Sequence, residues 1–157
     1  MTDLGQLLEW LAAKRRHVLM TLEGLDDASA RRVVVPSGWS PVHVVHHLAL
    51  DVERYWFQHV LSGLDVDLPS AGAWVLPPPS RAAVVELYRA ECARGDELLG
   101  SVSAGDLLIR GNEGPYSTAG EVILHVLVET TTHAGHLDVA RELIDGRQKL
   151  VVDDGPL

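Results

Sequence analysis

The chain has 157 residues and a formal net charge of −9, with 46% hydrophobic and 22% charged residues. These values are typical of a folded globular protein, and we expect residues 1–157 to form a single domain. The acidic balance disfavours a nucleic-acid partner, because binding to phosphate groups needs clustered Lys and Arg, and no apolar run approaches the roughly 18 residues that would cross a membrane.

The first predicted helix covers about residues 3–23, where leucine and valine recur at helical spacing. Thr2 is a candidate N-cap, and Gly24 marks the end of the helix. The basic cluster at residues 14–16, Lys-Arg-Arg, is interpreted as part of the solvated face of this helix.

The second predicted helix has a clear start signal, with Ser40 as N-cap and Pro41 in the first helical position. We expect it to continue to about Leu61. The stretch 64–79 is rich in proline, which excludes a helix or a central strand, so it is a crossover loop. Trp74 within it is expected to pin the loop to the rest of the protein.

The third predicted helix starts after Ser80 and ends at Gly100. Thr118 and Glu121 have the spacing of a capping box, which predicts the start of a fourth helix that ends at Gly146. Four such segments favour an all-α four-helix bundle. The long loop between the second and third helices permits those two to lie parallel.

Histidine is the residue type with the most informative distribution. Six of the eight histidines form two groups, namely His43, His46 and His47, and His125, His133 and His136. On a helical wheel at about 100° per residue, the fourth helix places His125, Glu129, His133 and His136 within an arc of about 80°. Apolar residues share or flank this arc, and Arg141 lies with other charged residues opposite it. We therefore expect the arc to be the buried face, with Glu129 and His133 in its middle.

A carboxylate on a buried face needs an explanation, because an ionised carboxylate costs several kcal/mol there unless it is paired or binds a cation. Glu129 and His133 are four residues apart, a spacing that lets one helix donate two ligands to a single ion. A hydrogen-bonded pair without metal is the competing interpretation. His125 and His136 are interpreted as groups that surround the site or line its cavity, rather than as ligands.

The second helix offers a third ligand, because His43 and His47 also lie four residues apart. Asp51 continues their stripe, followed by Arg54, and a plain solvated face would have the same pattern. Two histidines and one carboxylate would leave coordination positions open for water or a substrate, as in catalytic metal sites.

Three motifs in order, Gly38-Trp39-Ser40-Pro41, His47-Leu48-Ala49 and His133-Ala134-Gly135-His136, resemble the DinB-like superfamily of small metal-binding bundles, and most closely its actinobacterial branch. The resemblance covers nearly the whole chain. It implies an up-down-down-up bundle, and it implies His47, Glu129 and His133 as ligands of a divalent metal ion. The family pattern has histidine where this chain has Glu129. The related mycothiol-dependent maleylpyruvate isomerases are similar in having glutamate there, and the resemblance does not distinguish Zn, Ni or Fe.

The same resemblance implies an enzyme, a transferase or isomerase that uses a low-molecular-weight thiol such as mycothiol on an electrophilic small molecule. Arg54 is a candidate for orienting anionic groups of a substrate. A metal-dependent hydrolase and a non-enzymatic ligand-binding protein, with a homodimer as one form, remain alternatives. We expect a cytoplasmic protein, because residues 1–4 show no secretory leader and the single cysteine, Cys92, cannot form an internal disulfide. No neighbour of Cys92 favours it as a nucleophile.

Overall fold

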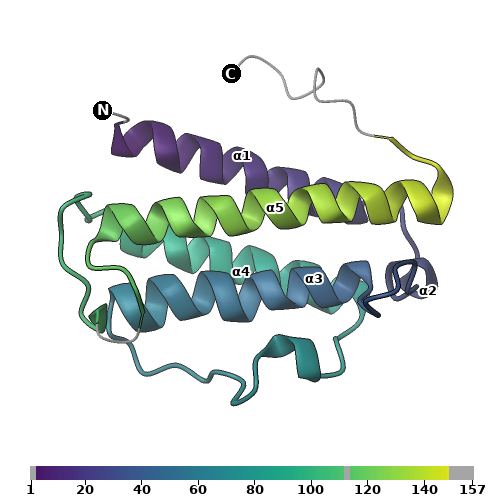
Figure 1. Ribbon diagram of the computed structural model, residues 1–157, viewed down its shortest axis with the longest axis horizontal. Helices are drawn as coiled ribbons and strands as arrows, with labels where there is room; N and C mark the ends of the chain where they lie inside the picture. Colours follow the sequence, from purple (N-terminus) through teal and green to yellow (C-terminus); the bar gives the residue numbers. More distant parts are fainter. Residues whose placement is uncertain (1–2, 112–113, 149–157) are drawn as a thin grey trace.

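The computed structural model describes residues 3–111 and 114–148. Four long helical segments pack side by side; α1 and α5 run in one direction, and the two middle segments run in the opposite direction (Figure 1). This all-α, up-down-down-up arrangement confirms the predicted fold. The segments are α1 (Leu4–Leu22), α3 (Pro41–His47) continued by η1 (Leu48–Leu61), α4 (Arg81–Leu99) and α5 (Ala119–Asp145), with the short helices α2 (Asp27–Ala30) and η2 (Ala73–Val75) in the connections. None of the helices in the described ranges is long and apolar enough to span a bilayer.

The helix ends follow local capping chemistry. The Glu121 side chain accepts hydrogen bonds from the backbone N–H groups of Ser117 and Thr118, which completes the predicted capping box of α5. Gly146 ends α5 with φ +77°, a backbone conformation that glycine adopts without strain. Thr2 lies outside the described residues, and Asp3 is the N-cap of α1.

The second predicted helix has the expected bounds but not a uniform backbone. It is α-helical from Pro41 to His47 and then π-helical, with hydrogen bonds between residues five apart, from Leu48 to Leu61. A wider turn rotates successive side chains differently from an α-helix. The predicted stripe still continues from His47 to Asp51, whose side chains lie 2.8 Å apart, whereas Arg54 binds Glu91 of α4.

The buried face of α5 is rotated relative to the prediction. Its fully buried positions include Val126, Thr130, Ala134 and Leu137, whereas Val128, Val139 and Leu143 are exposed. Arg141, predicted to be solvated, is only 7% exposed. Its guanidinium donates to the carbonyl oxygens of Thr21 at 2.8 Å and Glu23 at 2.6 Å. It thereby satisfies acceptors that the end of α1 leaves without helical partners.

The interpretation of residues 14–16 as a solvated face is wrong for Arg15, which is 5% exposed. Arg15 binds the fully buried Glu53 of η1 through two hydrogen bonds of 2.7 and 2.6 Å, and it also reaches Asp96 of α4. Gly95 provides the space for this pair, since a Cβ there would lie 3.2–3.3 Å from the Arg15 and Glu53 side chains. The buried Arg15–Glu53 pair thus joins α1 to η1, and the bond from Arg15 to the exposed Asp96 adds α4.

Side chains of η1 hold the crossover connection between η1 and α4 by hydrogen bonds to its backbone. Asp51 accepts hydrogen bonds from the backbone N–H of Ala73, and Arg54 donates to the carbonyl oxygen of Asp67 at 2.9 Å. The Trp74 ring stacks on the ring of His47, with centroids 4.6 Å apart. Trp74 therefore pins the loop to the bundle, as predicted from the sequence.

Candidate metal centre

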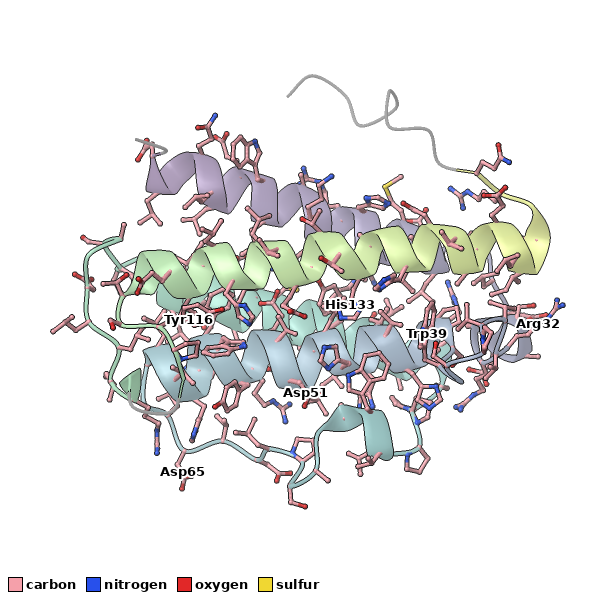
Figure 2. All side chains as sticks on the ribbon, in the orientation of Figure 1. Arg32, Trp39, Asp51, Asp65, Tyr116 and His133 are labelled. Carbon is pink, nitrogen blue, oxygen red and sulfur yellow. The ribbon has the colours of Figure 1, made fainter. Side chains whose placement is uncertain are left out.

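Three predicted residues from two helical segments come together midway along the bundle. His47 ends α3, and Glu129 and His133 lie one turn apart on α5. One potential ligand atom from each lies within 4.8 Å of the others, and all three residues are half-buried. Figure 2 shows His133 between α5 and the second helical segment, with Asp51 on the side of the crossover loop.

The orientation of the His47 ring is fixed by Asp51. The ring Nδ1 lies 2.8 Å from Asp51 Oδ2. Since an ionised carboxylate only accepts hydrogen bonds, Nδ1 is the donor in this bond, and in the neutral ring Nε2 is the nitrogen with the lone pair. A carboxylate behind a histidine in this way is the usual support of a histidine that binds metal, because it sets the ring's tautomer and raises its basicity.

His133 is held as a neutral base. The pKa of His133 is lowered to about 4. Desolvation is the largest cause and repulsion from His47 the second, whereas the charge of Glu129 opposes the shift. Its Nε2 lies 3.6 Å from Glu129 Oε2, and its Nδ1 lies 3.4 Å from Nδ1 of His136. A neutral imidazole is the form that binds metal ions, so protons do not compete for His133 near pH 7.

The prediction that Glu129 lies in the middle of the buried face is wrong. Glu129 lies at the rim of that face. Its side chain is 35% exposed and that of His133 is 14% exposed. Water therefore still reaches the Glu129 carboxylate, which does not carry the free-energy cost of a buried charge. The cluster is instead identified by the proximity of its three donor groups, on a face that solvent reaches.

The chemistry of the donor groups fits a divalent ion. Ligand atoms at about 2.0–2.2 Å from an ion lie roughly 3–4 Å from one another. The Glu129–His133 separation of 3.6 Å is already in this range, and the 4.8 Å limit for the full set needs only a small closure by side-chain rotation. Two imidazoles and one carboxylate suit zinc, nickel and iron alike. His47, Glu129 and His133 thus form a site that could hold a metal ion.

Two predicted residues of the second helix serve other contacts. His43 lies one turn before His47, and its Nδ1 binds the Ser40 side chain at 2.9 Å and the Ser40 backbone N–H at 3.3 Å. Arg54, predicted to orient a substrate, donates to Glu91 of α4 at 2.5 Å and to the crossover loop. Its charge is therefore paired with Glu91, a buried acid that no sequence pattern identifies.

The two remaining histidines of α5 flank the cluster on opposite sides. His125 Nδ1 lies 2.9 Å from the hydroxyl of Tyr116, and its ring packs edge-on against Trp56 at 4.7 Å. His136 is exposed and lies 6.0 Å from the ring of Trp39. Sequence reasoning did not associate Tyr116, Trp56 or Trp39 with the site. Only the loop-to-helix and helix-to-helix packing brings these aromatic rings beside it.

Cys92 offers no reactive thiolate. Burial raises the pKa of its thiol, and the neighbouring carboxylate of Glu53 raises it further. The thiol stays protonated at neutral pH, in agreement with the expectation that Cys92 is not a nucleophile.

A family model described as "MST: Mycothiol-S-transferase" matches residues 6–146, a range that includes His47, Glu129 and His133. Searches of curated proteins and of solved structures found no match to the chain.

Proposed function

Since the chain belongs to the mycothiol-S-transferase family, we propose that it is a divalent-metal-dependent enzyme that joins a mycothiol-type thiol to an electrophilic small molecule. The family match covers most of the chain and agrees with the resemblance to DinB-like bundles. The observation that carries the proposal is the convergence of His47, Glu129 and His133 on a face that a small molecule can reach.

The proposed chemistry depends on a nucleophilic sulfur. A divalent ion held by His47, Glu129 and His133 would act as a Lewis acid that lowers the pKa of a thiol in an open coordination position. The Glu129 carboxylate would be a ligand of the ion, and it could also accept the proton that the thiol loses. Asp51 holds the His47 ring in place throughout, and the neutral His133 contributes a lone pair and no repulsive charge.

The surroundings of the cluster support a reaction between two small molecules. Aromatic side chains stand on both sides of it, with Trp56 and Tyr116 beside His125, and Trp39 beside His136. Such rings exclude water from one side of a bound molecule and provide flat contact surfaces for it. The thiol could therefore bind on one side of the site, and the electrophile could approach its sulfur from the other side.

The proposal is tested with the variant His133→Ala. We expect it to lose most of its bound metal by elemental analysis and to lose metal-dependent consumption of mycothiol with an electrophile such as monochlorobimane. His17→Gln is the matched control, because His17 is bonded to Asp138 and lies outside the cluster. Undiminished metal content in His133→Ala would refute the metal site. If His133→Ala loses its metal but the wild-type protein transfers no thiol, the enzymatic activity is refuted and the metal site stands.

A further inference from the structure

A hollow with a volume of about 360 Å³ lies beside the candidate metal site formed by His47, Glu129 and His133. It is lined by Ser37, Gly38, Trp39, His43 and Trp74. Its size falls within the range of about 300–1,000 Å³ that is usual for sites that bind small molecules. The residues come from the turn before α3, from the first turn of α3 and from the crossover loop, so only the folded chain assembles them.

Ring contacts connect the lining of the hollow to His47 and His133. Trp74 stacks on His47 at 4.6 Å and lies 6.0 Å from the His133 ring. Trp39 lies 6.0 Å from His136, whose ring is 5.3 Å from that of His133. Figure 2 shows Trp39 beyond His133 along the length of the bundle, on the side away from Tyr116. The hollow is therefore adjacent to the candidate metal site, although none of His47, Glu129 and His133 lines it.

The lining combines flat aromatic surfaces with hydrogen-bonding groups. The two indole rings offer apolar faces, and Ser37 offers a hydroxyl group that both donates and accepts. His43 uses Nδ1 for its bond to Ser40, so Nε2 is the ring atom available to a ligand. Sugars and cyclitols match such a lining, because their rings have apolar C–H faces and edges of hydroxyl groups. A purely apolar electrophile would leave the polar groups without partners.

We infer that this hollow binds the polyhydroxylated part of the thiol substrate, the glucosamine and inositol rings of a mycothiol-type molecule. The inference rests on the proposed function for the identity of the thiol, and it adds the position and the chemistry of its recognition site. With the rings between Trp39 and Trp74, the cysteinyl arm of the thiol points toward His47 and His133. Binding energy from the sugar part then holds the sulfur where it reacts.

Two other hollows fit this ligand less well. One of about 390 Å³ is formed by α1 and α5, away from the crossover loop and the first turn of α3. It has a single aromatic ring in its lining, which consists of Trp10, Lys14, Leu127, Val128, Thr131 and Thr132. Another of about 310 Å³ includes Asp51. The Asp51 carboxylate already accepts hydrogen bonds from His47 and Ala73, so it has little capacity left for ligand hydroxyl groups.

Calorimetric titration of the zinc-loaded protein tests the inference with two fragments of the thiol. One probe is glucosaminyl-inositol, which has the rings without the thiol, and the other is N-acetylcysteine, which has the thiol without the rings. We expect Trp39→Ala, which removes one wall, and Ser37→Trp, which fills the hollow, to raise the Kd for glucosaminyl-inositol about tenfold or more. Both variants should retain their zinc and their affinity for N-acetylcysteine.

Trp10→Ala is the matched control, because it removes an equally large and partly exposed ring from the hollow between α1 and α5. It should bind glucosaminyl-inositol like the wild-type protein. The inference is overturned if the wild-type protein does not bind glucosaminyl-inositol, or if Trp39→Ala and Ser37→Trp both bind it normally. Sugar binding that depends on Trp39, in a protein without thiol transfer, would overturn the proposed activity and leave this site standing.

Discussion

Asp51 links His47 to the crossover loop. One of its carboxylate oxygens lies 2.8 Å from His47 Nδ1, and both accept from the backbone N–H of Ala73, at 3.0 and 2.9 Å. The same loop contains Trp74, whose ring stacks on the His47 ring that Asp51 binds. The position of a proposed metal ligand and the conformation of a loop more than twenty residues away in the sequence are thus tied to one side chain.

We predict that Asp51→Asn lowers metal affinity without removing a ligand. An amide cannot accept the His47 proton as strongly as a carboxylate, so the His47 ring becomes less basic and less well oriented. Loss of such a supporting group typically costs about 10–100-fold in metal affinity. Competition with a chromogenic zinc chelator measures this. Asp65→Asn, on the exposed part of the same loop, is the control, and equal zinc affinity in both variants would contradict the role of Asp51.

The metal-free protein should lose stability as the pH falls from about 6.5 to about 4. The pKa of His133 is 6.5 in its ordinary state and about 4 in the folded protein, because desolvation disfavours the charged ring. In this pH window the unfolded chain binds a proton at His133 that the folded chain does not, so unfolding becomes more favourable as the pH drops. His133→Gln removes this group and should flatten the pH dependence of the urea midpoint. An unchanged slope would show that His133 is not the group responsible.

The Arg15–Glu53 pair should make an asymmetric contribution to stability. Glu53→Leu leaves the guanidinium of Arg15 inside the bundle with only the exposed Asp96, and we expect a loss of about 3 kcal/mol in the free energy of unfolding by urea. The double variant Arg15→Met with Glu53→Leu should recover much of this loss, since no buried charge remains.

The exposed pair Arg94–Glu97 provides the comparison for that prediction. Its side chains are 47% and 67% exposed, so Arg94→Ala should change stability by no more than about 0.5 kcal/mol. If Glu53→Leu is as mild as Arg94→Ala, or if the double variant is less stable than Glu53→Leu, the buried pair does not behave as a coupled unit.

Much of the helical framework could be predicted because its signals are local. The Ser40-Pro41 start, the Thr118–Glu121 capping box and the glycine stops act through neighbours within a few residues, so the sequence contains the full interaction. Likewise, Glu129 and His133 share a face because they are four residues apart on one helix. The metal role of these two residues and of His47 stays a prediction, although the geometry brings the three together.

The choice between His43 and His47 was not available from spacing alone. Both lie on the same predicted helix, and the resemblance to DinB-like proteins favoured His47. In the structure His43 turns to Ser40, whereas His47 faces α5 at the point where the backbone changes from α-helical to π-helical. Asp51 also reaches Ala73 in the crossover loop and Arg54 reaches Glu91 of α4, and a helical wheel does not anticipate these contacts between distant segments.

The sequence by itself determined where the helices begin and end, the class of fold and the pair of ligand-type residues on α5. Only the tertiary structure decided which side of each helix is buried. Arg141 and Arg15 looked solvated, yet each is buried against partners 120 and 38 positions away. A charged side chain in a helix is buried or exposed according to whether a distant acceptor comes within hydrogen-bonding distance, and that depends on how the helices rotate against one another. The same rotation places Glu129 at the rim of the bundle, where a small molecule can reach it.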